Sequence, residues 1–208
     1  MDLTSLETTL AQSFASRDLL RDEPMSKHTT FRVGGPADLY LRPESAEDIA
    51  LAIAAANEHD VPWRVIGCGS DLLIADAGLR GLVIEIGENM SKITLDGNLL
   101  TAQAGATNKA VANAALEAGL TGYEFASGIP GSIGGAAIMN AGAYEGEFKD
   151  VARGVRCLFP DGCVREVSAD EADWGYRHSM MSDKGLIVID ATLELRYDDA
   201  ASIRARMD

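Results

Sequence analysis

The segment from Gly128 to Gly142 has the composition of a loop that presses its backbone against a ligand. Five of its fifteen residues are glycine, none is charged, and a polar residue, Asn140, lies near its end. Glycine costs roughly 1 kcal/mol per residue in a helix, so we expect neither an ordinary helix nor a strand here. A glycine backbone lets a flat or polyanionic group come close, and its amides can donate to phosphate oxygens. The alternative is a tight structural turn in a packed core.

A second candidate site is the sequence Ile-Gly-Cys-Gly-Ser-Asp at residues 66–71, directly after a short apolar stretch. It lacks the third glycine of a dinucleotide fingerprint and the Gly-Lys-Ser/Thr ending of a P-loop, so we reject both of those readings. The remaining functional interpretation is a small turn whose amides and Ser70 hydroxyl face a phosphate. Taken alone, such a turn is not specific to phosphate binding.

A third candidate is the sequence Tyr-Arg-His-Ser at residues 176–179, which follows an acidic stretch. Arg177 can be read in two ways. It is either a solvated surface charge or a fixed cation that stabilises an anionic substrate group or a developing enolate. The sequence pattern alone leaves both readings open.

The chain has 208 residues, a formal net charge of −14 and 47% apolar residues. This length and composition suffice for one large domain or two small ones with a buried core. The acidic balance argues against nucleic acid and an anionic membrane surface as partners, because both require clustered Lys and Arg. A small phosphorylated ligand stays compatible, since backbone amides and one or two arginines can hold it.

No apolar run reaches the length of a membrane span, and Asp2 and Glu7 lie where a signal peptide needs positive and apolar residues. We therefore expect a cytoplasmic protein. The cysteines and histidines show no metal-ligand spacing: Cys68, Cys157, Cys163, His28, His59 and His178. We expect neither a metal site nor a disulfide framework.

The elements that position the 66–71 turn are predicted from hydrophobic periodicity. An amphipathic helix is expected at 2–15, and Ser45 is placed to cap a second helix with an apolar stripe on one face. Strand patterns occur at 31–41, 63–66, 72–74 and 81–86. The turn therefore follows a buried strand directly.

A second block of elements begins near residue 93 and carries the other two motifs. Strand patterns occur at 93–95, 99–104, 155–159, 164–167 and 186–197. A helix is expected at 108–118 with Gly119 behind it, a hairpin turn at 160–162, and a polar helix from Asp198 onward. The helices and strands alternate without the regular spacing of a doubly wound sheet. The predicted fold class is therefore α+β in two lobes.

Four stretches of the sequence together resemble one family, the UDP-N-acetylenolpyruvoylglucosamine reductases. They are H-T-T-F-R-V-G-G-P-A at 28–37, I-G-C-G-S-D-L-L-I at 66–74, the glycine-rich stretch at 122–144, and Y-R-H-S at 176–179. Their order and spacing match the family from about residue 26 to residue 197. The glycine-rich stretch is highly specific to that family, and the shorter motifs support it.

The resemblance implies a flavoenzyme with the two-lobed α+β FAD-binding fold of the vanillyl-alcohol-oxidase/PCMH type. In that family NADPH reduces FAD, and the reduced flavin passes a hydride to the enolpyruvyl group of a UDP-sugar. The product, UDP-N-acetylmuramate, is a precursor of peptidoglycan. FAD is therefore the implied cofactor, NADPH the implied reductant and a UDP-sugar enolpyruvate the implied substrate. The flavin carries the electrons, and the protein supplies position and electric field.

The resemblance also assigns roles to individual residues. Arg177 matches the catalytic arginine, which polarises the substrate carboxylate and stabilises the enolate, and Tyr176 would lie beside it in the substrate channel. The implied FAD contacts are Ile66, Gly67, Cys68, Gly69, Ser70, Asp71, Leu72, Ser127, Gly128, Ile129, Pro130, Gly131, Ser132, Gly134, Gly135, Asn140, Gly142, Tyr144 and Val188. Asp71 departs from the asparagine usual in the family. A carboxylate near a pyrophosphate lowers affinity unless it points away or is paired.

The predicted organisation has an N-terminal helix and lead-in at 1–25, two FAD-binding lobes at 26–92 and 93–197, and the start of a connecting helix at 198–208. Family members continue into a further domain with a proton-donating serine and a glutamate, which we expect to be missing here. A chain without that domain should bind flavin weakly and turn over little or no substrate.

Three alternatives stay open at this point. One is another FAD-dependent oxidoreductase of the same fold with a different substrate. The second is a non-catalytic flavin-binding module. The third is that the glycine-rich segment is only structural, which predicts a colourless protein without flavin affinity.

Overall fold

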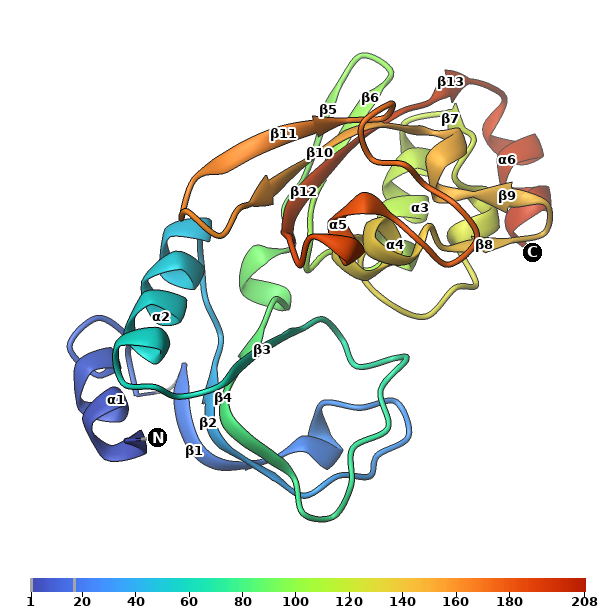
Figure 1. Cartoon of the computed structure of the whole chain (residues 1–208). Coiled ribbons are helices and arrows are strands. Elements are labelled where there is room, and N and C mark those ends of the chain that lie inside the picture. Colours follow the sequence, from blue (N-terminus) through green and yellow to red (C-terminus); the bar gives the residue numbers. More distant parts are fainter. Residues whose placement is uncertain (1, 17) are drawn as a thin grey trace. The chain divides into compact units, whose positions relative to one another are not determined.

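The computed structural model describes residues 2–16 and 18–208. The chain divides into two compact units, the first ending at Met90 and the second running from Ser91 to Asp208 (Figure 1). Both units contain helices and strands, so the predicted α+β class is confirmed. Among the described residues, no helix is both long enough and apolar enough to cross a membrane.

The first unit is built on a four-stranded sheet in the order β1-β2-β4-β3. Its strands are β1 (Leu19–Pro24), β2 (Pro36–Leu41), β3 (Trp63–Ile66) and β4 (Leu79–Glu85). Strand β1 pairs with β2 antiparallel, whereas β4 pairs in parallel with both β2 and β3. The helical elements are α1 (Leu3–Leu10), α2 (Ala46–Glu58) and the short 3-10 helices η1 (Met25–Lys27) and η2 (Glu88–Met90).

Local sequence signals explain where the elements of this unit begin. Helix α2 starts as predicted, because the Ser45 hydroxyl accepts the backbone N–H of Asp48. Helix α1 is shorter than the predicted 2–15 and ends at Leu10. A core cluster contains Met25, Ala37, Tyr40, Ile66, Ile74 and Val83, with Leu20, Leu72 and Leu79 packed against it. This cluster fixes both sides of the turn that follows β3.

Two strands of the first unit differ from the sequence prediction. Residues 72–74 form no strand, because Leu72 and Ile74 reach the core from an irregular segment. Strand β1 has no predicted counterpart. Half of its residues are charged, in the run Arg-Asp-Glu. The strand lies at the edge of the sheet, where charged residues are common.

The second unit is built on an antiparallel five-stranded sheet in the order β11-β10-β12-β6-β5. Its strands are β5 (Ile93–Asp96), β6 (Leu99–Gln103), β10 (Ala152–Leu158), β11 (Val164–Ser168) and β12 (Ile187–Glu194). The predicted hairpin and the long strand near the end of the chain are therefore confirmed. Two small pairs add β7 (Leu120–Thr121) with β13 (Arg196–Tyr197) and β8 (Gly142–Ala143) with β9 (Gly146–Glu147).

Helices of the second unit connect these strands. They are α3 (Asn108–Glu117), α4 (Ile133–Met139), α5 (Met180–Asp183), α6 (Ala200–Met207), η3 (Glu124–Ala126) and η4 (Phe148–Asp150). Helix α3 ends as predicted, with Gly119 in the left-handed region at φ +67°. Helix α6 confirms the polar helix predicted after Asp198 and is capped by Asp199, whose side chain accepts the backbone N–H of Ser202.

The expectation that residues 128–142 contain no regular helix is wrong, because Ile133–Met139 forms α4. This helix packs against β6 and β12 and buries three apolar side chains there. Their burial offsets the cost of Gly134 and Gly135, about 1 kcal/mol each in a helix. The glycine-rich stretch is therefore an irregular loop followed by a short packed helix.

Candidate functional site

Tyr176 and Arg177 form the tip of a tight two-residue turn. The backbone N–H of Gly175 donates to the oxygen of His178 at 3.1 Å, and the N–H of His178 donates to the oxygen of Gly175 at 3.3 Å. Arg177 has a φ of +53°, in the left-handed region that tight turns require. The Tyr176 side chain is 86% exposed, and its ring centroid lies 5.7 Å from the guanidinium carbon of Arg177. The turn thus presents an arginine with an aromatic ring beside it.

This tip is attached to the C-terminal end of helix α4 from both sides. Trp174 Nε1 donates to the backbone oxygen of Ala137 at 2.7 Å, and Ser179 Oγ donates to the backbone oxygen of Ile138 at 2.7 Å. The last carbonyls of a helix have no partners within the helix, so side chains commonly satisfy them. Ser179 is fully buried, so its hydrogen bond is shielded from water. The position of the tip is therefore set by α4.

Asn140 joins the end of α4 to two further segments. It is 2% exposed and has a φ of +41°, a left-handed conformation that asparagine tolerates well. Its Nδ2 donates to the backbone oxygen of Gly175 at 3.0 Å and to Glu147 Oε2 at 3.1 Å, and its Oδ1 accepts the Lys149 N–H at 3.0 Å. Both amide protons are therefore used by the protein. The Asn140 side chain therefore has no amide proton left to donate to a cofactor.

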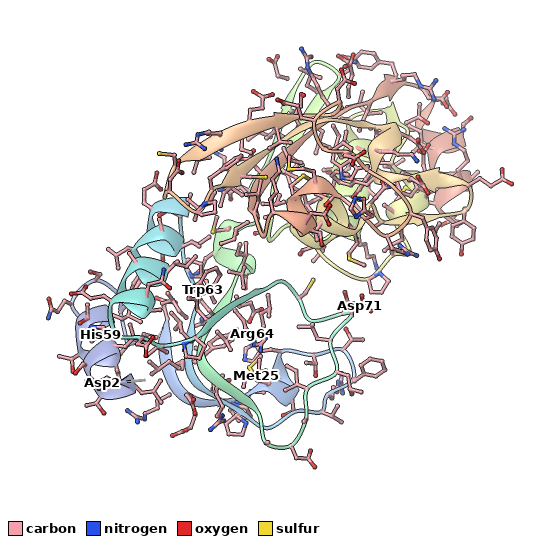
Figure 2. All side chains as sticks on the ribbon, viewed as in Figure 1. Asp2, Met25, His59, Trp63, Arg64 and Asp71 are labelled. Atoms are coloured by element: carbon pink, nitrogen blue, oxygen red, sulfur yellow. The ribbon has the colours of Figure 1, made fainter. Side chains whose placement is uncertain are left out.

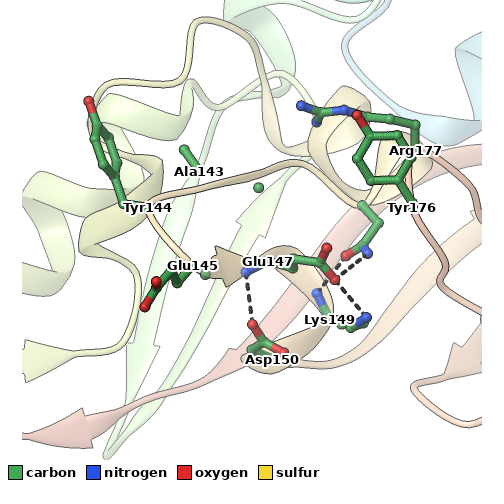
Figure 3. Close-up of a pocket in the computed structure, with 11 residues that line it drawn as sticks. Ala143, Tyr144, Glu145, Glu147, Lys149, Asp150, Tyr176 and Arg177 are labelled. Atoms are coloured by element: carbon green, nitrogen blue, oxygen red, sulfur yellow. Dashed lines mark hydrogen bonds and ion pairs between the residues drawn. The ribbon is translucent and has the colours of Figure 1, made fainter.

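A pocket of about 420 Å³ lies between this turn and the segment that follows α4 (Figure 3). It is lined by Asn140, Gly142, Ala143, Tyr144, Glu145, Gly146, Glu147, Lys149, Asp150, Tyr176 and Arg177. Tyr144 lies on the opposite side of the pocket from Tyr176 and Arg177. The structure thus brings together five residues that the sequence assigned to the site from distant stretches: Asn140, Gly142, Tyr144, Tyr176 and Arg177.

The charges in the pocket are unequally paired. Lys149 Nζ lies 2.6 Å from Glu147 Oε2. The hydrogen bond from Lys149, followed by that from Asn140, lowers the pKa of Glu147, and the charge of Arg177 contributes to the same shift. Within the described ranges, the guanidinium of Arg177 forms no hydrogen bond and no ion pair. Arg177 therefore presents a positive charge that an anionic ligand can pair with.

The loop before α4 is held by Asn108, which is 1% exposed. Asn108 Nδ2 donates to the oxygen of Ile129 at 3.3 Å, and its backbone N–H donates to the oxygen of Gly131 at 3.1 Å. Two amides of α4 also have protein partners, since the N–H groups of Ile133 and Gly134 donate to backbone oxygens of the loop after β6 at 2.8 and 2.9 Å. The segment therefore offers fewer free amides than its glycine content suggests.

Four of the glycines of this segment fall into two groups. Gly131 has a φ of +133°, and a Cβ on Gly134 would lie 3.0 Å from the Cβ of Ala104, so the fold itself requires glycine at both. At Gly128 and Gly135 an added Cβ would meet no atom within 4 Å. Neither residue has a positive φ. Nothing within the described chain requires glycine at these two positions, whereas a flat group lying against the backbone would.

The 66–72 turn belongs to the first unit, and the fold itself requires glycine at position 69. A Cβ on Gly69 would lie 1.9 Å from the backbone oxygen of His28, and Gly69 has a φ of +60°. Ile66 and Leu72 point into the core cluster and hold the ends of the turn. Cys68 and Asp71 are exposed, and Figure 2 shows Asp71 on the loop after β3. Asp71 is thus on the surface, as a tolerated carboxylate requires.

The sequence prediction and the structure differ on several residues around the pocket. Val188, an implied FAD contact, is 3% exposed on β12 and is not among the residues that line the pocket. Conversely, four residues organise the site without having been singled out for it: Asn108, Glu147, Lys149 and Trp174. Each acts through a hydrogen bond or ion pair with a residue whose position only the fold determines. Spacing along the chain could not identify them.

Asn140→Ala is expected to lower the free energy of unfolding by about 2–4 kcal/mol. The substitution removes the hydrogen bonds to the Gly175 oxygen and from the Lys149 N–H, and one of those to Glu147. It also places alanine in a left-handed conformation. Urea denaturation of the purified chain measures the loss. The matched control is Asn57→Ala, an exposed asparagine whose side chain accepts one hydrogen bond from Trp63, for which about 1 kcal/mol or less is expected. Equal losses would contradict the central role of Asn140.

Comparison with known proteins gives a consistent result. The protein family described as "FAD binding domain" matches residues 37–168. The UDP-N-acetylenolpyruvoylglucosamine reductase of Clostridium perfringens (strain SM101 / Type A) is 43% identical over 199 residues, covering 96% of this chain and 65% of the relative. The reductase of the same name from Pediococcus pentosaceus is 44% identical over 203 residues, covering 98% of this chain and 67% of the relative.

Solved structures agree with these matches. The crystal structure of UDP-N-acetylenolpyruvylglucosamine reductase (MurB) from Thermus caldophilus has a TM-score of 0.77 and 32% identity, and covers 91% of this chain and 66% of that one. An alkyldihydroxyacetonephosphate synthase has a TM-score of 0.68 and 20% identity, with 92% and 40% covered, and shows a likeness of fold alone. The chain spans about two thirds of the length of the curated relatives that it matches.

Proposed function

Because this chain belongs to the UDP-N-acetylenolpyruvoylglucosamine reductase family and contains its FAD binding domain, we propose that it is the flavin-binding part of such a reductase. The activity proposed for the whole protein is the NADPH-dependent reduction of UDP-N-acetylglucosamine enolpyruvate to UDP-N-acetylmuramate. This reaction serves peptidoglycan synthesis, and we place it in the cytoplasm. The proposal concerns the whole protein, since the chain spans 65% of the first relative's length.

The observation that carries the proposal is the pair of glycines at 128 and 135. The fold accepts a side chain at both positions, yet both are glycine. Gly128 lies in the loop before α4, and Gly135 lies in the first turn of α4. A flat or polyanionic group lying against this backbone accounts for that choice. The residues present therefore fit FAD. We assign its contacts to Gly128, Gly135 and the neighbouring loop backbone, and to the 66–72 turn of the first unit.

When bound, FAD supplies the capacity to accept a hydride from NADPH and deliver it to the substrate double bond. The residues of this chain position the substrate and stabilise charge. The guanidinium of Arg177 pairs with the substrate carboxylate and stabilises the negative charge that spreads onto it as the double bond is reduced. The ring of Tyr176 lies beside the guanidinium, within the range of a cation–π contact. The charge of Lys149 is offset by Glu147, so Arg177 is the cation left for the substrate.

The proposal gives no residue of this chain the role of proton donor to the enolate. The reaction needs one, and a positioned donor contributes about 10²–10⁴-fold to such a step. We therefore propose that residues 1–208 bind FAD but turn over little substrate on their own. Substantial reduction of the enolpyruvyl sugar by the isolated chain would contradict this part of the proposal.

The visible spectrum of the purified chain tests the central claim. The chain, as isolated and after addition of FAD, is expected to show a flavin absorption band that stays with the protein through gel filtration. The released cofactor, identified by mass, is expected to be FAD. Equilibrium titration with FAD and, as the control, with riboflavin separates binding of the pyrophosphate from stacking of the ring alone. A protein that stays colourless in excess FAD, both as this chain and as the whole natural protein, would overturn the assignment.

A further inference from the structure

The first unit contains a largely buried cluster of ionisable groups that the proposed reaction does not use. His28 follows η1 and lies between two carboxylates. Its Nε2 is 3.1 Å from Glu23 Oε1, and its Nδ1 is 2.7 Å from Glu85 Oε2. The hydroxyl of Tyr40, which is fully buried, lies 2.8 Å from the same Nδ1. Lys27 pairs with Glu23 from the exposed side at 3.1 Å.

Each ring nitrogen of His28 faces a carboxyl oxygen, and a neutral imidazole carries only one N–H. With an N–H at Nε2 directed at Glu23, a second proton is required at Nδ1 or on the Glu85 carboxyl group. If both were unprotonated, a nitrogen lone pair and a buried carboxylate oxygen would face each other at 2.7 Å. Glu85 Oε2 is buried, and within the described ranges it forms no hydrogen bond of good geometry. Burial raises the pKa of Glu85 and the charge of Glu23 adds to this shift, while His28 acts in the opposite direction. The couple of His28 and Glu85 therefore favours holding the proton.

The same residues are attached to the 66–72 turn through the backbone. The backbone oxygen of His28 lies against Gly69, closely enough that only glycine fits there. Two residues later, the N–H of Thr30 donates to the oxygen of Gly69 at 3.1 Å. Glu85 is the register partner of Ile66, the last residue of β3. Both the start and the middle of the turn are thus connected to the couple.

We infer that the proton shared by His28 and Glu85 holds the 66–72 turn in its conformation, so that these two are positioning residues and binding of the cofactor is linked to one proton. The link to the cofactor depends on the proposed function. The other ionisable groups facing His28 come from each neighbouring element: Glu23 from β1, Lys27 from η1 and Tyr40 from β2. Lys27 offsets Glu23, which leaves Glu85 as the group that responds to pH.

The sign of the effect follows from the raised pKa of Glu85. Stabilisation of the turn is complete below the ordinary pKa of a carboxyl group and is lost as the pH rises through the raised value. Above it, the second proton is lost, and the carboxylates of Glu23 and Glu85 both face the ring in a largely buried site. The turn is then expected to loosen. The hydrogen bond from the N–H of Thr30 to the oxygen of Gly69 is expected to open more often.

Hydrogen exchange of the Thr30 amide tests the linkage without any cofactor. Its protection factor, corrected for intrinsic exchange and followed from about pH 5 to about pH 9, is expected to fall by up to about tenfold per pH unit above the pKa of the couple. Glu85→Gln removes the ionisable carboxyl but keeps a donor toward Nδ1, so its profile is expected to be flat. The control Glu7→Gln removes an exposed carboxylate of the same unit, which pairs with Arg21, and should keep the wild-type profile.

FAD affinity over the same pH range gives the second readout. The dissociation constant of the wild-type chain is expected to rise with pH in parallel with the loss of Thr30 protection, and that of Glu85→Gln to stay constant. A wild-type protection profile that is flat, or one that Glu85→Gln leaves unchanged, would overturn the inference even if FAD binds. A chain that shows the proton-linked protection but binds no FAD would instead overturn the proposed function and leave the turn linkage intact.

Discussion

Gly135→Ala is expected to stabilise the chain in the absence of FAD and to weaken its binding of FAD. Gly135 is the third residue of α4, is exposed, and has no atom within 4 Å of an added Cβ. Replacing a helical glycine by alanine at such a site should raise the free energy of unfolding by about 0.5–1 kcal/mol. A methyl group facing the proposed FAD site should raise the dissociation constant about 10- to 100-fold, which corresponds to overpacking a contact by about 1.4–2.8 kcal/mol.

The substitution is informative because stability and FAD affinity are expected to change in opposite directions, whereas damage to the fold would lower both. Denaturant unfolding and FAD titration on the same preparation measure them. The matched control is Gly134→Ala, one position earlier on the same helix. Its Cβ would lie 3.0 Å from Ala104, so it should gain none of the stability. If Gly135→Ala were more stable and bound FAD as the wild type does, the glycine-rich segment would be only structural.

Arg177→Ala is expected to lower kcat of the whole natural protein about 10²–10³-fold, as loss of a charge-stabilising group in other enzymes does, and to leave FAD affinity unchanged. The guanidinium has no ion pair within the described residues, so its removal breaks no salt bridge of the fold. Arg177→Gly is the second neutral variant, because glycine accepts the φ of +53° without strain. Equal losses in the two variants would assign the effect to the missing charge and not to the turn.

Steady-state kinetics with the enolpyruvyl sugar nucleotide and NADPH measures this effect. Arg177→Lys is expected to recover only part of the activity, since an ammonium group cannot form two parallel hydrogen bonds to a carboxylate. Arg204→Ala, an exposed arginine on α6, serves as the control and should retain full activity. Turnover that survives in both neutral variants would contradict the catalytic role and favour a non-catalytic flavin-binding module.

The parts of the fold that could be predicted are those with local signals. Ser45 marks the start of α2, Gly119 follows the end of α3, and Pro-Asp-Gly joins β10 to β11. The two-lobed FAD-binding fold implied by the resemblance is confirmed by the family match and by the solved structures. Helix α4 could not be predicted, because packing against β6 and β12 outweighs the low helix propensity of its glycines.

For the candidate site, the sequence motifs identified its position, but the contacts that build it could not be predicted. The Tyr176–Arg177 pair and Asn140 were placed by motifs that lie far apart in the chain, and the structure brings them to one pocket. The hydrogen bonds from Trp174 and Ser179 to α4 span about forty residues of sequence and depend on tertiary packing. The FAD contacts assigned by the resemblance stay predictions until binding is measured.

Helix α4 also acts as a spacer of fixed length. Its first turn carries Gly135, and its last carbonyls and Asn140 hold the arginine turn. Seven helical residues span about 10 Å, and each one adds about 1.5 Å and a rotation of about 100°. Removing one residue would therefore swing the carbonyls away from Trp174 and Ser179 while shortening the spacer. The distance from Gly135, a proposed FAD contact, to the turn that carries Arg177 is thus set by helical pitch.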